Sequence, residues 1–370
     1  MFTLFFAFMI SAIMGKVILI TNEIHAKLSH DHDISSVQKH HQIPVPRIGG
    51  LAIFTAVVVT ALLCANMGVT WVKYISGVTV ALFFIFIAGI SEDLTKNVGP
   101  IKRLLLMSFG GVIAVYAVSV LPIITHIGIS LVDHDLPQYS FFCMIITILL
   151  VSGVTNSFNI IDGYNGLSAT TGICILVAIV VLANKADCNE VYYAGLCLIG
   201  SILGFLIYNY PRAKVFLGDC GAYTIGFSIA VLAIYLSQYA AKQICPLTFL
   251  LIASYPIIEV LFSIYRRKFI KNVSALHPDK LHMHQLIYYR CSIQGAKFRN
   301  DMVMPRMLWF ILPQIVYALF FYDDIIFISI GLVLSVVFYI YIYNRITRFK
   351  TPFILINFKR RNQSKDDTKR

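Results

Sequence analysis

The 370-residue sequence has little charge, because only 13% of its residues are Asp, Glu, Lys or Arg. Soluble domains carry about 25%. The sequence is also 58% hydrophobic, with a mean hydropathy of +0.78. This shortage of charge excludes a water-soluble fold and intrinsic disorder, and the composition excludes coiled coils and collagen. The sequence therefore predicts an integral membrane protein.

Closely spaced cysteines are also missing, since the eight cysteines include no CxxC pair and most lie in apolar runs. Cysteines of this kind are usually small core residues. A zinc site or a disulfide scaffold would need a regular spacing of cysteines. Residues 1–20 lack the basic start and the small-residue cleavage site of a signal peptide, so we predict a helix there.

Long apolar segments are abundant, and a spanning helix needs about 20 such residues. We predict an all-α, polytopic transmembrane bundle of about 11 spans. Residues 1–343 would form a single domain, and 344–370 a basic cytoplasmic tail. The predicted spans are 1–20, 49–67, 71–91, 104–125, 139–155, 165–183, 191–208, 221–240, 246–262, 304–321 and 324–343.

The basic residues predict the orientation of these spans. With the N-terminus outside, 25 of the 30 Lys and Arg residues fall on the inner side and only three in outer loops. The positive-inside rule then places the C-terminus in the cytoplasm. No nucleic-acid-binding motif is present, so no nucleic-acid partner is expected. The inner segments are 21–48, 92–103, 156–164, 209–220, 263–303 and 344–370.

Acidic residues avoid the membrane interior. Of the eighteen, only Glu259 lies in the interior of a predicted span, near its inner end, while Asp324 is the first residue of another. Proton-coupled transporters usually place ionisable groups near the midplane. The distribution therefore favours chemistry at the cytoplasmic face on a charged, water-soluble substrate. A transporter or flippase without chemistry is the less favoured alternative.

Glu92 and Asp93 are adjacent carboxylates at an inner membrane face. Such a pair repels itself unless a cation or a base lies nearby. One interpretation is a solvated helix end. The other is a general base or a carboxylate beside a metal, with Lys102 available for a phosphate.

The segment 156–167 contains Asn156, Asn159, Asp162 and Asn165 with two glycines and no basic residue. Asn and Asp offer oxygen ligands for Mg²⁺ and hydrogen bonds for a base or a ribose. A simple turn would need only one or two of these residues. We therefore expect a metal or nucleoside site in this segment.

The motif Gly218-Asp219-Cys220-Gly221 opens a predicted helix close to two cations and Phe216. A carboxylate there either caps the helix or holds Mg²⁺ against a pyrophosphate. In the second interpretation Phe216 stacks on a planar base.

His282 and His284 form an HxH pair in the basic segment 263–303. The pair suits a metal or a phosphate. Zinc would need further ligands at a suitable spacing, and the surrounding cations favour a phosphate role.

In this order, and together with the approach Pro46-Arg47-Ile48-Gly49-Gly50, these motifs resemble a known family. It is the polyprenyl-phosphate N-acetylhexosamine-1-phosphate transferases of glycosyltransferase family 4. The family includes lipid I synthase and the enzymes that initiate O-antigen and enterobacterial common antigen. Eleven helices with the C-terminus inside resemble the initiating enzymes more than the ten-helix lipid I synthase.

The resemblance implies a role for each candidate residue. Asn159 and Asp219 would bind Mg²⁺, for which Mn²⁺ could substitute. The Glu92–Asp93 pair would serve the lipid phosphate. Two residues depart from the family pattern, since Glu92 and Asn165 stand where many members have Asp. The remaining roles are uracil stacking by Phe216, lining of the nucleoside site by Asn156, Asp162 and Asn165, and contact with phosphates and sugar by Lys102, His282 and His284.

The resemblance also implies a reaction. A UDP-N-acetylhexosamine would transfer its sugar-1-phosphate to undecaprenyl phosphate in the bilayer and release UMP, initiating a cell-envelope polysaccharide. The active site would lie on the cytoplasmic face of a bacterial inner membrane, and a homodimer is compatible with the family. Lipid I synthesis from UDP-N-acetylmuramoyl-pentapeptide is the nearer alternative.

Overall fold

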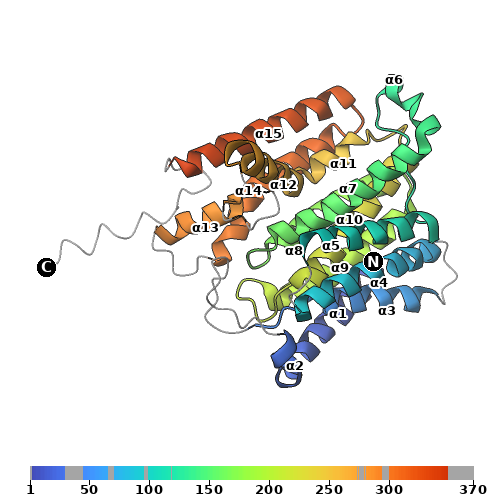
Figure 1. The fold of residues 1–370 in the computed structure, drawn as a ribbon. Helices are drawn as coiled ribbons and strands as arrows, with labels where there is room; N and C mark the ends of the chain where they lie inside the picture. The colour runs from blue at the N-terminus through green and yellow to red at the C-terminus, as the bar shows by residue number, and fades with distance from the viewer. Residues whose placement is uncertain are drawn as a thin grey trace.

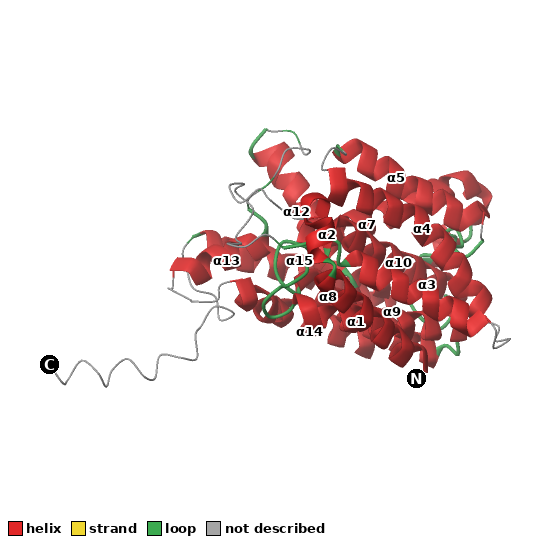
Figure 2. Cartoon of the chain, turned by 90° about the horizontal axis from the view of Figure 1, so that it is seen from below, coloured by secondary structure: helices red, strands yellow, loops and turns green. Residues whose placement is uncertain are grey.

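The computed structural model describes residues 2–29, 45–65, 71–95, 99–117, 119–272, 274, 279, 281–293 and 300–348. Over these residues the fold is helical and contains no strand (Figure 2). Eight segments among them are long and apolar enough to cross a membrane. They are α1 (Phe2–Ile20), α4 (Trp71–Thr95), η2 with α7 (Leu136–Ile161), α8 (Leu167–Lys185), α9 (Asn189–Asn209), α10 (Gly218–Tyr239), η4 with α14 (Asn300–Phe320) and α15 (Ile325–Thr347).

The other helices of the described chain are shorter. They are α2 (Asn22–Ser29), α3 (Gly50–Ala65), α5 (Pro100–Val112), η1 (Ile113–Ala117), α6 (Ser130–Asp133), α11 (Leu247–Ile252), α12 (Ser254–Tyr265), η3 (Arg266–Ile270) and α13 (Met283–Ile293). Each predicted span overlaps a helix, and the all-α prediction is confirmed. The number of spans and their direction stay predictions.

Three local expectations need correction. The helix expected over 104–125 ends at Ala117, and residues 119–129 are not helical. The helix expected over 246–262 is broken at Ala253, because Pro256 has no N–H for the preceding turn. The predicted loop 21–48 contains α2, while its residues 30–44 lie outside the described residues, as do 349–370 of the tail.

Small residues let α1 pack closely on α9. Thr3, Ala7, Ser11 and Gly15 recur every four residues and are all buried. Such stripes allow helix backbones to approach in membranes, where the hydrophobic effect gives no drive for association. The opposite face of α1 exposes large apolar side chains such as Phe5 and Ile13, as expected for contact with lipid.

The two ends of the bundle differ in character. Figure 1 shows the long helices side by side, with α2 and α13 at one end and α6 at the other. At the α6 end, Gln238 holds the loop at Thr125 and His126 through hydrogen bonds. The segments that carry the candidate site residues meet at the opposite end.

Candidate active site

Asp93 fixes the start of α10. Its carboxylate oxygens accept hydrogen bonds from the backbone N–H groups of Asp219 and Cys220, at 2.8 and 2.9 Å. A carboxylate at a helix N-terminus satisfies free amides and complements the helix dipole. The last turn of α4 therefore positions the first turn of α10, and Asp219 with it.

Backbone pairing brings Arg47 to the same place. The N–H of Phe216 donates to the carbonyl of Pro46 at 2.8 Å, and the N–H of Gly49 donates to the carbonyl of Phe216 at 2.9 Å. An Nη of Arg47 consequently lies 3.3 Å from Asp219 Oδ1 and 3.8 Å from Asp93 Oδ1. The ring of Phe216 is half-buried beside this pairing.

Arg103 is the second cation of the site. Its guanidinium pairs with Glu92 and lies 3.3 Å from Asp219 Oδ2, which also accepts a hydrogen bond from the Tyr223 hydroxyl. The neighbouring Lys102 is exposed, with no ion pair within the described chain. We call Glu92, Asp93, Asp219, Arg47 and Arg103 the carboxylate–arginine cluster.

Asp162 adds a further carboxylate to this region. It follows the last residue of α7, and Asn156 and Asn159 lie on the final turns of that helix and not in a loop as expected. Burial raises the pKa of Asp162 to about 8; Arg47 opposes the shift, and the negative charges of Asp219 and Asp93 reinforce it. The Asp162 carboxyl is therefore mostly protonated at neutral pH.

Asn165 ties three segments together. Its Nδ2 donates to the carbonyl of Pro211 at 3.0 Å and to Asp301 Oδ1 at 3.3 Å. The N–H of the next residue, Gly166, donates to Asn209 Oδ1 at 2.7 Å, and Asn209 Nδ2 donates to the carbonyl of Val215 at 2.9 Å. Asn165 therefore lies close to the segment that carries Phe216.

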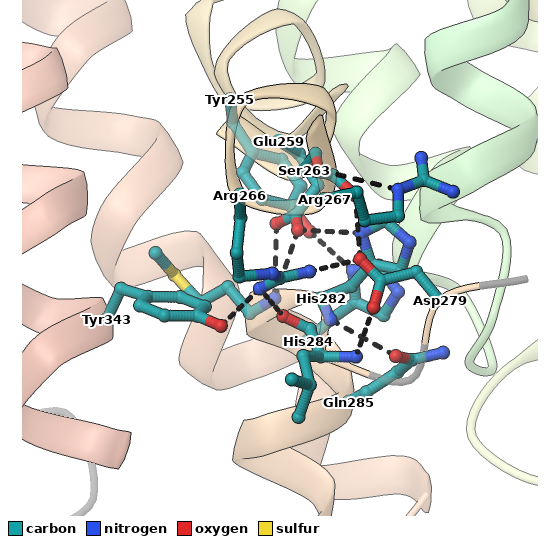
Figure 3. A network of polar contacts seen from close by, with 12 residues as sticks. Tyr255, Glu259, Ser263, Arg266, Arg267, Asp279, His282, His284, Gln285 and Tyr343 are labelled. Atoms are coloured by element: carbon teal, nitrogen blue, oxygen red, sulfur yellow. Dashed lines mark hydrogen bonds and ion pairs between the residues drawn. The ribbon is translucent and has the colours of Figure 1, made fainter. Parts of the chain in front are cut away.

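The two histidines are anchored by α12 (Figure 3). Nδ1 of His282 lies 2.9 Å from Glu259 Oε1, and the N–H of Met283 donates to the same oxygen at 3.1 Å. His284 Nδ1 lies 3.1 Å from the Tyr255 hydroxyl. Burial lowers the pKa of His284 to about 3, so this imidazole is neutral at physiological pH.

A buried ion pair joins Arg266 of η3 to Asp279, which precedes α13. Arg266 binds Asp279, the Tyr343 hydroxyl and the carbonyl of Leu281, as Figure 3 shows. Burial alone would raise the pKa of Asp279, but the Ser263 hydrogen bond and the Arg266 charge hold it below its usual value. Histidine placement thus depends on contacts with α12 and α15.

The residues after α7 connect this histidine region to the carboxylate–arginine cluster. The ring of Tyr164 packs edge-on against His284, with centroids 5.7 Å apart. A side chain at Gly163 would lie 3.5 Å from His284 Nε2. Because the charges of Arg47 and Asp219 affect the pKa of Asp162, this short segment contacts His284 and lies within electrostatic reach of the cluster.

The structure thus gathers most of the sequence-derived candidates at one end of the bundle and leaves Lys102 on the exposed surface. Their functional roles stay predictions. Sequence reasoning did not select Arg47, Arg103, Tyr223 or Glu259 as site residues. Arg47 lies in the motif Pro46–Gly50, Arg103 follows the selected Lys102, and Glu259 was the only acidic residue in the interior of a predicted span.

Comparison with known proteins indicates the family of this chain. The model of glycosyl transferase family 4 matches residues 75–237. A Bacillus subtilis protein named probable undecaprenyl-phosphate N-acetylglucosaminyl 1-phosphate transferase is 30% identical over 287 residues, covering 75% of this chain and 74% of that protein.

Other relatives carry related names. A Mycobacterium tuberculosis decaprenyl-phosphate N-acetylglucosaminephosphotransferase is 30% identical over 73% of this chain and 70% of its own length. A phospho-N-acetylmuramoyl-pentapeptide-transferase of Halalkalibacterium halodurans is 33% identical over 38% of this chain and 43% of its own. With coverage this extensive in the first two relatives, the chain belongs to glycosyl transferase family 4.

Proposed function

We propose that this protein transfers an N-acetylhexosamine-1-phosphate from a UDP-sugar to undecaprenyl phosphate, releasing UMP and initiating a cell-envelope polysaccharide. The observation that carries the proposal is the carboxylate–arginine cluster, which lies where α4 ends and α3, α5 and α10 begin. The names of two relatives matched over about three quarters of this chain, which describe polyprenyl-phosphate N-acetylglucosamine-phosphate transfer, support it.

In this reaction an oxygen of the lipid phosphate attacks the β-phosphorus of the UDP-sugar. The bond from that phosphorus to the bridging oxygen breaks, and the electron pair leaves with UMP. The lipid phosphate is already ionised near neutral pH, so the site must orient it more than deprotonate it. The side chains of Arg47 and Arg103 are each 27% exposed, so they can meet substrate phosphates while paired.

Mg²⁺ is part of the proposal. No group of three or more His, Cys, Asp or Glu residues in the described chain is arranged to hold a metal. Mg²⁺ usually takes only one or two protein carboxylates, with water and phosphate oxygens completing its shell. The oxygens of Asp219 and Asn159 suit it, and the negative charges of Asp219 and Asp93 add to the effect of burial in raising the pKa of Asp162. Bound there, the ion would offset charge on the pyrophosphate.

The other residues divide between the two substrates. Phe216, Asn156, Asp162 and Asn165 would hold the nucleoside. Glu92 would orient Arg103, while Asp93 would act through α10, since both of its oxygens bind amides there. His282 and His284 would contact phosphates and sugar. One substrate is in the bilayer and the other in the cytosol, so we place the site at the cytoplasmic face of the inner membrane.

A panel of UDP-sugars tests the proposal. Purified protein, undecaprenyl phosphate and Mg²⁺ should release UMP from a UDP-N-acetylhexosamine, and EDTA should abolish the release. An Asp219→Asn variant is the control for release that does not depend on the site. Release only from UDP-N-acetylmuramoyl-pentapeptide would instead indicate lipid I synthesis. No release from any donor would contradict the proposal and favour a transporter.

A further inference from the structure

The amide of Asn165 has a fixed orientation. Its Nδ2 faces the carbonyl oxygen of Pro211 and a carboxylate oxygen of Asp301. Neither a carbonyl nor an ionised carboxylate can donate a hydrogen bond, so the atom between them must be the nitrogen. Both amide hydrogens of Asn165 are therefore used, and Oδ1 is the polar atom left over.

That oxygen is available to a ligand. Within the part of the chain that the structure describes, Asn165 Oδ1 accepts no hydrogen bond. It is also not among the unpartnered polar atoms that are sealed from solvent there. A lone acceptor recognises a hydrogen-bond donor on its ligand. An acceptor that faces N3 favours uracil, whose N3 carries a hydrogen, over cytosine, whose N3 is an acceptor and whose donor is the amine at C4.

Asp301 is itself well placed to hold this amide. It lies in η4, whose neighbouring residue Asn300 accepts a hydrogen bond from the N–H of Asn165 at 2.9 Å. The carbonyl of Asp301 accepts a hydrogen bond from the Tyr210 hydroxyl at 3.2 Å. Helix η4 is therefore hydrogen-bonded both to Asn165 and to Tyr210, which precedes the segment that carries Phe216. An aspartate at position 165 could donate to neither of its two acceptors.

We propose that Asp301 is a positioning residue, which turns the Asn165 amide so that its oxygen meets the base and selects uracil over cytosine. The inference deepens the proposed function and rests on it, since a uridine nucleotide is taken as the donor. Asn209 supports the geometry, because it links Gly166 to Val215 beside the predicted stacking ring of Phe216.

The test measures discrimination between UMP and CMP. Their affinities for the purified full-length protein are obtained from ligand-dependent thermal shifts, and KM and kcat are measured with the UDP-sugar. Wild type should prefer UMP. Asp301→Ala should reduce this preference about tenfold, the scale of one lost charge-assisted hydrogen bond. It should raise KM by a similar factor with kcat little changed, while Asp301→Asn, which keeps an acceptor, should restore most of the preference.

Asp324→Ala is the matched control. Asp324 caps α15 at the far end of the molecule by accepting hydrogen bonds from Ile326 and Phe327 N–H groups. Its removal should lower thermal stability and leave the UMP preference intact. An unchanged preference in Asp301→Ala would overturn the inference.

A second variant covers a failure of Asp301→Ala to fold. Asn165→Ala removes the acceptor itself, so it should also abolish the UMP preference, and an unchanged preference would again overturn the inference. Because nucleotide binding needs no turnover, these outcomes are separate from those of the donor panel. Binding that behaves as expected without UMP release would contradict only the proposed reaction.

Discussion

Gly218 is required by two independent constraints at the residue scale. It has a φ of 74°, a left-handed conformation that costs other residues about 1–2 kcal/mol. A Cβ there would collide with the carbonyl oxygen of Arg47 and lie 2.7 Å from Asp93 Oδ2. We expect Gly218→Ala to displace Asp93 from the α10 amides and to lower kcat/KM by more than tenfold, measured by UMP release.

Gly153 provides the control for this substitution. It lies in α7, and a Cβ added there would have no neighbour within 4 Å. Gly153→Ala should leave activity unchanged and raise stability by roughly 0.5–1 kcal/mol, as in other helices. Equal activity of the two variants would show that the Gly218 backbone does not matter for the site.

Sequence alone could not choose between Lys102 and Arg103. Adjacent residues on a helix point about 100° apart, so only one of them can face the site. The choice depends on how α5 lies against α4 and α10, which no local pattern specifies. Arg103 pairs with Glu92 and Asp219, while the phosphate contact expected of Lys102 stays a prediction.

At the scale of elements, two helices begin on a carboxylate supplied by another helix. Asp93 of α4 holds the start of α10, and Glu259 of α12 holds the start of α13. The sequence predicted one helix over 246–262, but the structure breaks it just before Pro256, whereas Pro313 lies inside an unbroken α14. Proline therefore marks candidate breaks, and packing decides which of them form.

The Glu259 contact predicts a specific defect. A carboxylate can only accept, so it fixes the proton of His282 on Nδ1 and leaves Nε2 for a ligand. Glu259→Gln removes the charge and allows the ring to turn. We expect kcat/KM to fall about tenfold and stability to fall by about 1–3 kcal/mol, the scale for a buried charged hydrogen bond.

UMP-release kinetics and thermal unfolding in detergent would check both effects. Glu190→Gln is the matched control, because Glu190 lies in the first turn of α9 at the far end of the bundle. It should leave kcat/KM unchanged. Wild-type activity in Glu259→Gln would show that the orientation of His282 does not matter for catalysis.

At the scale of the whole molecule, hydropathy predicted where the helices lie, because each long apolar run must satisfy its backbone hydrogen bonds internally. It could not predict that the polar segments after α7, before α10 and before α13 meet. Those meetings depend on contacts between distant residues, such as Tyr164 with His284 and Asn165 with Asp301.

His284 and Asp162 make the stability of the molecule depend on pH in opposite directions. The pKa of His284 is about 3, against an ordinary value of about 6.5, so the unfolded chain takes up its proton first as pH falls. Stability is then lost from about pH 6.5 downward. The pKa of Asp162 is about 8, against an ordinary value of about 3.9. Its contribution is present at low pH and is lost as pH rises to 8.

Between about pH 4 and 6.5 these two slopes oppose each other, and above 6.5 the slope of His284 has ended while that of Asp162 continues to pH 8. We expect the melting temperature in detergent with EDTA to fall between pH 6.5 and 8. One linked proton changes the free energy of unfolding by at most about 1.4 kcal/mol per pH unit, which limits the size of this fall. A cation beside these carboxylates lowers the pKa of Asp162, so Mg²⁺ should flatten the slope.

Asp162→Asn should flatten the slope without Mg²⁺, whereas His134→Gln, at an exposed histidine near α6, should not. A slope that persists in Asp162→Asn would show that the titrating group lies elsewhere in the molecule.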